Sequence, residues 1–547
     1  MGSRGGLWIR PARAMDFHMQ TLQTPVLIIG AGATGAGIAR DLALRGVASL
    51  VVEQADINAG ASGANHGLLH SGCRYVSNDP HTASECYEES QRLRGLMAQC
   101  IEDTGGLFVA VAGDDERYVA DFPDLCRRCG IPVTALSPTE AREMEPALSS
   151  STIAAFLVPD ASVDPFRLVI QHLEQAVELG AQVLRHHRVD QMDCRGGRVQ
   201  AVILRDLKGG KTIAVHADQI VNASGAWAGE VASKAGVHLP MRYSKGTLVV
   251  THSRMAQMVI NRLRPPADGD ILVPGGTVSI LGTTSVPIED LSEIIPTVAE
   301  TDHIVAEGSL MVPALAEARF IRAYAGVRPL VDSGARSGND RKISRGFVLM
   351  DHGGDGVANL ITITGGKLST FRIMARETAD LVCRHLGVQT PSTTDRTPLP
   401  DSPQTAWSEP GRSSRIWLHG HRPDDQLLCE CEMVSRQVVD EVLVRLQARG
   451  LCPDLHALSV RTRIGKGACQ GAFCSLRLLA YLYERGLMPG AAGIGQLRRF
   501  FEERWKGQRP VLWDGQLAQA ELSEALYCGL FGLERKEAAT GNPWGAP

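Results

Sequence analysis

Four cysteines in the last quarter of the chain are the residues whose types and spacing point most directly to chemistry. Cys429 and Cys431 form a Cys-x-Cys pair, and Cys469 and Cys474 form a Cys-x4-Cys pair. Four thiolates can hold either a zinc ion or a [2Fe–2S] cluster. Cys-x-Cys is less usual for zinc than Cys-x2-Cys, but the pattern alone leaves both metals open.

The segments around these cysteines predict a positive environment. A basic, Gly-rich loop at residues 461–468 (RTRIGKGA) leads into Cys469, and Cys474 opens an expected helix over residues 475–485. The N-terminus of that helix and the cations Arg461, Arg463 and Lys466 would stabilise a reduced, more negative cluster.

A second group of residues, near the N-terminus, has the pattern of a dinucleotide site. An apolar strand at residues 26–29 runs into residues 30–35 (GAGATG), a helical pattern follows, and a strand at residues 49–52 ends at Glu53. This order of strand, GxGxxG, helix, strand and acid is that of a βαβ dinucleotide-binding unit. The free N–H groups of the helix N-terminus can bind phosphate. Glu53 can accept hydrogen bonds from both ribose hydroxyls, and its charge argues against NADP.

Three later segments favour FAD over NAD. Residues 60–67 (GASGANHG) form a Gly-rich stretch where FAD enzymes run an extended loop along the cofactor. Residues 220–227 (IVNASGAW) and 361–370 (ITITGGKLST) each indicate a buried strand that ends in a turn of small residues. The predicted cofactor-binding residues are Gly30, Gly32, Ala33, Thr34, Gly35, Glu53, Ser62, Asn65, His66, Gly67, Leu68, Val189, Ala223, Gly225, Trp227, Gly326, Gly365, Gly366, Lys367 and Leu368.

The bulk composition is that of an ordinary globular protein of two to four domains. The chain has 547 residues, of which 44% are hydrophobic and 21% charged, and its net charge is −4. These values argue against general affinity for nucleic acid or for an anionic membrane. We find no apolar run long enough to span a bilayer and no secretory apolar core, so we expect a cytoplasmic protein with most of its 13 cysteines reduced.

Together these motifs resemble the FAD-dependent glycerol-3-phosphate dehydrogenases, and most closely the catalytic A subunits of the bacterial anaerobic enzymes. The resemblance covers about residues 25 to 534. Besides the cysteine pairs, the segments that carry it are residues 30–40 (GAGATGAGIAR), 65–75 (NHGLLHSGCRY), 163–168 (VDPFRL), 270–275 (DILVPG), 323–330 (AYAGVRPL), 364–368 (TGGKL) and 503–507 (ERWKG).

The resemblance implies oxidation of sn-glycerol 3-phosphate at C2 to dihydroxyacetone phosphate, with hydride transfer to flavin N5. The substrate is a phosphate dianion, so its pocket needs fixed cations, and Arg supplies a charged fork. The predicted catalytic and substrate-binding residues are Arg328, Lys367, Arg74, Tyr75, Arg345 and His70, with Lys245 as a weaker candidate. The sequence does not identify the base, for which His66 and His70 are the candidates nearest the flavin loop.

The cysteine segment is similar to small BFD-type [2Fe–2S] domains, although their second pair is commonly Cys-x2-Cys. Together with an upstream flavin, this similarity favours iron over zinc. The resemblance implies a flavin-containing partner subunit and a membrane-anchoring Fe–S subunit, and electrons that pass through the cluster and these partner subunits to a quinone. The chain would thus associate peripherally with the cytoplasmic face of the inner membrane.

The expected fold combines α/β and α+β parts: a Rossmann-type FAD domain with an antiparallel-sheet substrate domain, as in D-amino-acid oxidase, then a BFD-like domain and C-terminal helices. The predicted units are a flexible extension (1–22), a discontinuous FAD and substrate domain (23–387), a linker (388–425), a [2Fe–2S] domain (426–482) and a helical segment (483–547). The cations and aromatics of residues 498–506 would dock a partner subunit or the membrane surface, or the aromatics would pack on the chain's own domains.

Two other functions remain open at this point. FAD-dependent amine or opine dehydrogenases also join this flavin fold to BFD-type domains, but they need a pocket for a carboxylate. A non-catalytic flavin and Fe–S electron carrier would use the same cofactors without a substrate pocket. Cys126 and Cys129 form an isolated Cys-x2-Cys without a second pair nearby, so we expect them to be helix residues and not metal ligands.

Overall fold

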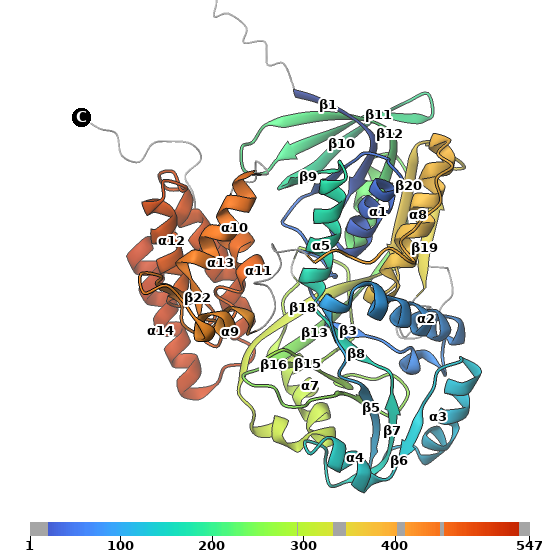
Figure 1. Cartoon of the computed structure of the whole chain (residues 1–547), viewed down its shortest axis with the longest axis vertical. Helices are drawn as coiled ribbons and strands as arrows, with labels where there is room; N and C mark the ends of the chain where they lie inside the picture. The colour runs from blue at the N-terminus through green and yellow to red at the C-terminus, as the bar shows by residue number, and fades with distance from the viewer. Residues whose placement is uncertain (1–19, 293, 332–345, 402–410, 449–452, 535–547) are drawn as a thin grey trace, which may run out of the picture.

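The computed structural model describes residues 20–292, 294–331, 346–401, 411–448 and 453–534 in three packed parts (Figure 1). A sheet with a parallel centre lies in the upper part of the figure, and a second, mostly antiparallel sheet lies below it. The C-terminal helices lie beside the two sheets, at the left. Within the described ranges, none of the helices is long and apolar enough to cross a membrane.

The first sheet has eight strands, which are β1 (Gln20–Ile29), β2 (Ser49–Glu53), β9 (Gln182–Arg185), β10 (His187–Arg195), β11 (Arg198–Asp206), β12 (Thr212–Asn222), β19 (Phe347–Asp351) and β20 (Leu360–Gly365). At its centre β1 runs parallel to β2 and β12, with Val26 opposite Ser49 on one side and Gln219 on the other. Parallel strands that are covered on both faces consist of continuous apolar residues. Residues 26–29 form such a run and are buried in the structure.

The helices that cover one face of this sheet are α1 (Ala33–Leu44), α5 (Pro165–Glu178) and α8 (Phe371–Leu386). The other face packs against the short helix α6 (Ala228–Ser233) and side chains of the β10–β11 hairpin. A side chain at Gly35 would overlap the Gly30 carbonyl oxygen, so a glycine there lets α1 approach β1 closely. This is the helix–strand packing role that the fingerprint predicts for its third glycine.

The second sheet has nine strands, which are β5 (Gly106–Val111), β6 (Thr134–Leu136), β7 (Thr152–Val158), β13 (Met241–Thr251), β14 (Val259–Arg262), β15 (Ile271–Gly275), β16 (Val278–Gly282), β17 (Val286–Ile288) and β18 (Phe320–Val331). The long β13 and β18 pair antiparallel from Met241 opposite Val331 to Thr251 opposite Phe320. Helices α4 (Pro138–Met144) and α7 (Val298–Met311) share one core with this sheet, and α3 (Glu116–Arg128) shares another.

Three further pieces lie in the connections between these elements. Helix α2 (Pro80–Leu96) follows the short 3-10 turn η1 (Cys73–Tyr75). A small sheet joins β3 (Leu68–Leu69), β8 (Ala161–Val163) and β4 (Ile101–Glu102). The turn η6 (Leu368–Thr370) links β20 to α8.

The C-terminal part has its own apolar core and consists of a two-stranded sheet and six helices among the described residues. Its elements are α9 (Arg412–His419), β21 (Leu427–Cys429), β22 (Val434–Ser435), α10 (Arg436–Ala448), α11 (Leu455–Thr462), α12 (Cys474–Glu484), α13 (Ala492–Gln508) and α14 (Asp514–Phe531).

The structure refines two of the predicted segments. β1 begins at Gln20, which pairs with Ile213, so the first sheet starts inside the predicted extension. The first part of the predicted linker lies against α1: Arg40 donates to the Thr397 carbonyl at 2.7 Å, and the Ser392 hydroxyl donates to Asp41 at 2.5 Å. The remaining boundaries stay predictions.

Buried charges connect the C-terminal helices to the first sheet. Asp56, just after β2, pairs with Arg185 at 2.8 Å and lies 3.9 Å from Arg461 of α11. Asp454, the N-cap of α11, pairs with Lys208 at 2.6 Å. Apart from Lys208 these side chains are buried. Because an unpaired buried charge costs roughly 3–5 kcal/mol, the network holds α11 in one position on the sheet.

Candidate functional site

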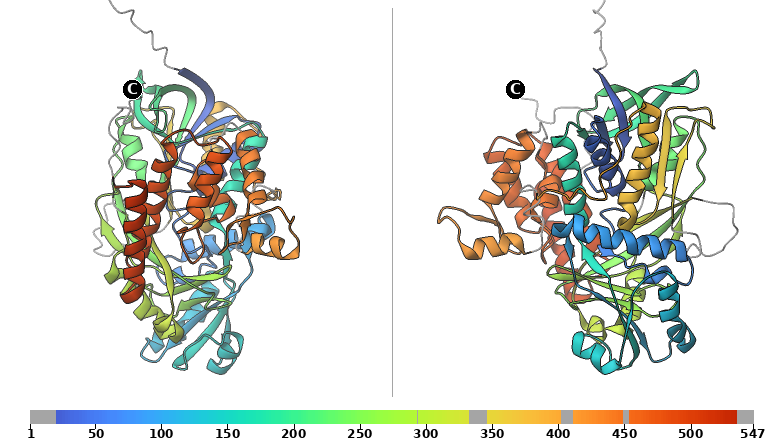
Figure 2. Two further views of the ribbon diagram at one scale, coloured as in Figure 1. Left: turned by 90° about the vertical axis from the view of Figure 1, so that its left-hand side faces the viewer. Right: turned by 45° about the vertical axis from the view of Figure 1, so that its right-hand side comes forward.

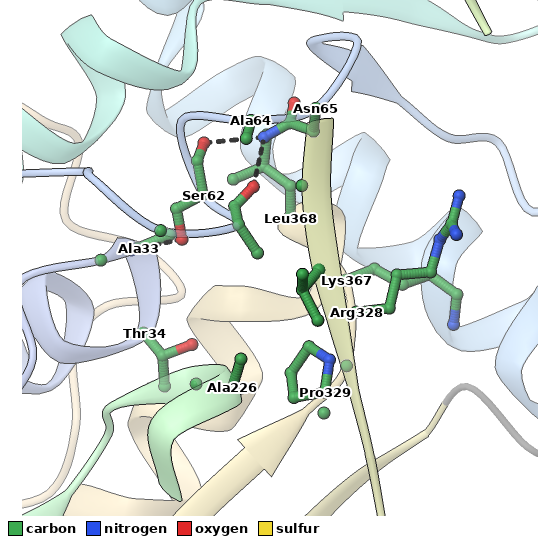
Figure 3. A pocket seen from close by; sticks show the side chains of 18 of the residues that line it. Ala33, Thr34, Ser62, Ala64, Asn65, Ala226, Arg328, Pro329, Lys367 and Leu368 are labelled. Carbon is green, nitrogen blue, oxygen red and sulfur yellow. Dashed lines mark hydrogen bonds between the residues drawn. The ribbon is translucent and has the colours of Figure 1, made fainter. Parts of the chain in front are cut away.

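One cavity of about 840 Å³ lies where the two sheets meet. The N-terminus of α1, the loop after β2, the middle of β18, η1 and the turn between β20 and η6 all line it. Figure 3 shows Ala33 and Thr34, then Ser62, Ala64 and Asn65, and Lys367 with Leu368 around the same space as Arg328.

The α1 end of the cavity is built as an anion site. Gly30 has a φ of +110°, and a side chain there would meet the Ala223 carbonyl oxygen at 2.5 Å. The turn is locked because the Gly30 N–H donates to the Val52 carbonyl at 2.8 Å. The Ser62 hydroxyl accepts from the Ala33 N–H at 3.0 Å, which brings the Gly-rich loop over the helix N-terminus. A helix N-terminus with no acidic residue in its first turn favours a bound phosphate.

Glu53 lies at the rim of the same cavity, at the end of β2. One of its carboxylate oxygens accepts from the Ala31 N–H at 3.0 Å, and the other accepts from the Ala55 N–H at 2.9 Å. Burial raises the pKa of Glu53, although these two N–H donors oppose the shift. The backbone donors orient the carboxylate, and its remaining lone pairs can accept from ribose hydroxyls.

Opposite this end, β18 and the β20 turn approach the Gly-rich loop. A side chain at Gly326 would overlap the Ala64 carbonyl oxygen, so only glycine permits the loop to lie on β18. The Tyr324 hydroxyl donates to the Asn65 carbonyl at 2.7 Å and fixes that contact. Lys367 reaches over the Tyr75 ring, with its Nζ 4.5 Å from the ring centre.

Arg328 supplies a cation to the other end of the cavity. Its guanidinium donates to the Thr284 carbonyl at 3.2 Å, to the Ser244 hydroxyl at 3.4 Å and to the Thr283 hydroxyl. A side chain at Gly246, on the neighbouring β13, would lie 2.7 Å from the guanidinium. Glycine at that position therefore leaves the room that the arginine occupies.

Arg74 adds a second guanidinium, held from behind by a buried acid. Its Nη2 donates to Asp270 at 2.9 Å and to the Ala267 carbonyl at 3.1 Å. Its Nη1 is buried and has no hydrogen-bond partner among the residues that the structure describes. Tyr75 and His70 line the same cavity, with ring centres 5.6 Å apart.

His66 lies between these cations and the Gly-rich loop. Burial lowers the pKa of His66 to about 3, and the positive charges of Arg328 and Arg74 act in the same direction. The ring donates one hydrogen bond to the Gly282 carbonyl. Its Nε2 is buried and has no partner in the described part of the chain, so His66 offers a neutral nitrogen that can accept a proton.

Comparison with known proteins identifies the family. A match to the FAD dependent oxidoreductase family covers residues 25–371. Over 94% of its length the chain is 42% identical to the A subunit of the anaerobic glycerol-3-phosphate dehydrogenase of Escherichia coli, and the match spans 97% of that protein. The chain belongs to the family of these A subunits. The A1 subunit of the enzyme from Haloferax volcanii is 39% identical over 94% of this chain and 92% of its own length.

The fold agrees with this assignment. The FAD complex of a glycerol-3-phosphate dehydrogenase from Bacillus halodurans superposes with a TM-score of 0.61 at 20% identity, over 90% of this chain and 96% of that one. Membership of an FAD-dependent family and a cradle of this shape make FAD the cofactor of the α1 site. The predicted FAD fold with its two kinds of sheet is confirmed.

Nearly all predicted site residues within the described ranges line the cavity. The exceptions among the cofactor residues are Gly35 and Gly67, which are packed against the Gly30 and Val163 carbonyls instead. Arg345 lies outside the described residues. Lys245 was a wrong candidate: it points to the other side of β13 from Ser244 and Gly246 and pairs with Glu300 of α7 at 3.0 Å. The alternation of side chains along a strand accounts for this.

Sequence reasoning missed several lining residues, among them Gly246 and Thr283, which surround the Arg328 guanidinium. Gly246 faces Gly326 across the β13–β18 pair, and Ser244 faces Arg328. Only the pairing register brings these positions together. The signal available in the sequence was Gly246 itself, the single glycine within β13. A glycine inside a strand often marks a place where a ligand or another part of the chain approaches closely.

The four predicted ligand cysteines converge at the start of α12. The Cys474 thiol hydrogen-bonds the thiols of Cys429 and Cys469, and Cys431 hydrogen-bonds Cys469. Backbone N–H groups also face the sulfurs, from Gly465 to Cys429 and from Gly471 and Phe473 to Cys469. Across the described ranges, however, no group of three or more His, Cys, Asp or Glu residues is arranged to hold a metal ion. The identity of the metal therefore stays a prediction.

The predicted cations around the cysteines have other partners as well. Arg461 reaches Asp56, Arg463 donates to Glu432 at 3.1 Å, and the Lys466 Nζ lies 4.3 Å from the centre of the Phe166 ring. Two of the three thus contact the flavin-binding part. Cys126 is buried in α3, as predicted for a helix residue, and Cys129 follows the helix as its C-cap.

The Glu53 geometry yields a test of the cofactor site. We expect Glu53→Gln to weaken FAD binding about 10-fold or more, because hydrogen bonds to a charged acceptor are worth roughly 1.5–3 kcal/mol. Flavin content per chain after dialysis, over a series of FAD concentrations, measures the change. Asp218→Asn, which changes an exposed acid on β12 of the same sheet, is the control and should bind FAD as the wild type does. Equal FAD affinity in the two variants would show that Glu53 does not bind the cofactor.

Proposed function

We propose that this chain is the catalytic subunit of a glycerol-3-phosphate dehydrogenase and oxidises sn-glycerol 3-phosphate to dihydroxyacetone phosphate. The observation that carries the proposal is that the FAD cradle and the Arg328 guanidinium line one and the same cavity. The relatives named as A subunits of anaerobic glycerol-3-phosphate dehydrogenases match nearly the full length of the chain and support the choice of substrate.

In this proposal Arg328 and Arg74 bind the substrate phosphate. Both are arginines that line the cavity, and neighbouring backbone or acid groups hold both in place. A planar guanidinium forms paired hydrogen bonds with phosphate oxygens. Asp270 balances part of the Arg74 charge while the buried Nη1 keeps hydrogen-bonding capacity for the ligand. Fixing the phosphate at this end would orient C2 toward the cofactor.

His66 is the base in this mechanism. Its Nε2 would accept the C2 hydroxyl proton as the C2–H bond breaks, and FAD, when bound, supplies the hydride acceptor. A neutral imidazole beside two cations also avoids a third positive charge in the substrate-free site. The Gly282 carbonyl, which accepts from the other ring nitrogen, sets the tautomer that leaves Nε2 free of a proton.

The convergent thiols support the electron-transfer part of the proposal. Cys429, Cys431, Cys469 and Cys474 would hold a [2Fe–2S] cluster, which would supply one-electron transfer when present. Backbone N–H donors facing the sulfurs are the hydrogen bonds that tune such clusters. Partner subunits, one with a flavin and one with an Fe–S centre and a membrane anchor, would carry the electrons to a quinone. The chain would accordingly lie at the cytoplasmic face of the membrane.

Anaerobic addition of glycerol 3-phosphate to the purified, FAD-loaded chain tests this function. We expect saturable loss of the oxidised-flavin absorbance, because the substrate delivers a hydride and no external acceptor is present. Amino acids and opines serve as comparison substrates. Bleaching by one of those alone would assign an amine or opine dehydrogenase. No bleaching by any of them would assign a non-catalytic carrier and contradict the proposal.

Arg328→Ala should keep FAD and lose most of the turnover of glycerol 3-phosphate. Removing one partner of a desolvated charge pair costs at least about 2–5 kcal/mol, so kcat/KM should fall roughly 30-fold or more. Steady-state assays with a dye acceptor and the flavin content of the same sample give the two readouts. Arg198→Ala, at an exposed position of β11, is the matched control. Wild-type kcat/KM in Arg328→Ala would exclude this residue from substrate binding.

The low pKa of His66 leads to a pH prediction. A base works only when deprotonated, so a depressed pKa keeps His66 active across about pH 5–8. Arg74→Gln removes one of the charges that lower this pKa. Because burial, the largest cause of the low pKa, remains in this variant, the pKa of His66 should rise only part of the way toward its ordinary value, and the acid limb of the activity profile should move to higher pH. The pH profile of kcat/KM, compared between variant and wild type so that substrate ionisation cancels, measures the shift.

Two outcomes would contradict the His66 assignment. The first is an Arg74→Gln profile with the same acid limb as the wild type. The second is a His66→Ala variant that retains wild-type kcat/KM while binding FAD normally. His81→Ala, at an exposed position of α2, is the control for removal of an imidazole.

A further inference from the structure

The end of β16 and the two residues after it, residues 282–284, hold two side chains of the proposed site. Arg328 donates to the Thr284 carbonyl at 3.2 Å and to the hydroxyl of the residue before it. The first residue of the segment, Gly282, accepts a hydrogen bond from His66 through its carbonyl. The position of this short segment therefore sets the positions of the proposed phosphate ligand and of the proposed base.

Thr284 is itself held through its side chain, which is buried. Its hydroxyl accepts from the Thr247 N–H of β13 at 3.0 Å and donates to a carboxylate oxygen of Glu300 at 3.2 Å. A hydroxyl has one proton to donate, and here that proton is directed to the carboxylate. The side chain of Thr284 thus faces α7 and β13, while its carbonyl faces the Arg328 guanidinium.

Glu300 belongs to α7, which is yellow-green in Figure 2 and packs on the second sheet. Its second oxygen accepts from the Lys245 Nζ at 3.0 Å and from the hydroxyl of Thr297, the N-cap of α7, at 2.8 Å. The Lys245 and Glu300 side chains are only 10% and 11% exposed. Lys245 also donates to the Ile295 carbonyl at 2.8 Å. The carboxylate is therefore fixed by partners on both of its oxygens.

We propose that Glu300 is a positioning residue for phosphate binding, which acts through Thr284 on Arg328, and that Lys245 holds Glu300 in place. The proposal rests on the proposed function, because it takes Arg328 to bind the substrate phosphate. A carboxylate acceptor gives the stronger kind of hydrogen bond. Because Lys245 neutralises Glu300, the network can hold Thr284 without adding net negative charge behind an anion site. Lys245, which the sequence singled out as a candidate for the site, would thus serve it indirectly.

Substitutions of Thr284 in the FAD-loaded chain test the proposal. Thr284→Val removes the hydroxyl and nearly keeps the shape of the side chain, whereas Thr284→Ser keeps the hydroxyl. We expect Thr284→Val to raise KM for glycerol 3-phosphate about 5-fold or more, with a smaller change in kcat, because Arg328 is no longer correctly aimed. Thr284→Ser should restore KM to within about 2-fold of the wild type. Steady-state assays with a dye acceptor measure both constants.

Substitutions of Glu300 test the same path from α7. Glu300→Ala should raise KM as Thr284→Val does, and the double variant should have no larger effect than either change alone, because both break one connection. Glu300→Gln keeps an oxygen acceptor and should have a smaller effect, so the pair of Glu300 variants carries the test if Thr284→Val does not retain FAD. Thr297→Ala is the control, since it removes the N-cap hydroxyl of α7 and leaves the contact between Glu300 and Thr284 in place.

Three results would overturn the proposal. The first is a wild-type KM in folded Thr284→Val and Glu300→Ala, with FAD content and the thermal midpoint as the measures of folding. The second is an equal rise of KM in Thr297→Ala, which would assign the effect to the cap of α7. The third is full additivity of the Thr284 and Glu300 substitutions.

Binding of inorganic phosphate separates this proposal from the proposed activity. The thermal midpoint of the FAD-loaded chain, followed over a series of phosphate concentrations, gives the dissociation constant. Thr284→Val should weaken phosphate binding about 5-fold or more, and it should have no further effect in the Arg328→Ala background. If glycerol 3-phosphate fails to bleach the flavin while these phosphate results hold, the proposed activity is wrong and the positioning role stands. If bleaching succeeds and Thr284→Val binds phosphate as the wild type does, the positioning role is wrong.

Discussion

The pairing of β18 with β13 is the constraint on which the rest of the functional architecture depends. Along about 20 Å of β18, Arg322 lies at the C-terminal helices, Tyr324 holds the Gly-rich loop, and Arg328 enters the cavity. The α13 residue Gly507 packs directly on this strand, where a side chain would meet the Ala323 carbonyl at 2.7 Å. One rigid strand therefore sets the positions of the cofactor loop, the substrate end and the cysteine part relative to one another.

The cavity works through an imbalance of buried charge. Arg328 and Arg74 bring two cations to it, and Asp270 offsets only part of that charge because it also pairs with Arg264 at 2.7 Å. The remaining positive potential favours an anionic ligand and lowers the pKa of His66 at the same time. In the proposed function, the charges that would bind the phosphate therefore add to burial, the larger cause, in keeping His66 neutral. In the proposed function, the charge that binds the substrate also prepares the group that deprotonates it.

The network of buried charges around Asp56 holds the C-terminal helices in a fixed position on the first sheet. Asp56 follows Glu53 by three residues, so the segment that would orient the cofactor's ribose end also anchors α11. A second contact, between Lys466 and Phe166, lies between the cysteine loop and α5. Both contacts involve charge, and the Asp56 contact is buried while Lys466 and Phe166 are half-buried, so they favour a single arrangement of the two parts. A fixed arrangement is what transfer of electrons from a flavin to the cysteine site would require.

The parts of the site that the sequence could predict are those in which chemistry and structure are local. The turn at Gly30, the helix N-terminus at Ala33 and the acid at Glu53 follow one another within a single βαβ unit, so spacing alone indicated a dinucleotide site. The convergence of the four thiols was likewise expected from their types. Lys245 shows the limit of such reasoning. It lies in a segment that lines the cavity, but its side chain points to the other face of β13 and pairs with Glu300. Gly246 and Thr283 were missed because only strand register brings them to Arg328.

The sequence by itself thus determined the kind of cofactor, the family and the residue types that serve the site, because glycine turns, terminal acids and paired cysteines act over a few residues. Only the tertiary structure decided which arginines share a cavity and which histidine is left neutral with an available nitrogen. Those properties depend on burial and on the distances between charges from separate strands. Neither burial nor these distances can be derived from the spacing of residues along the chain.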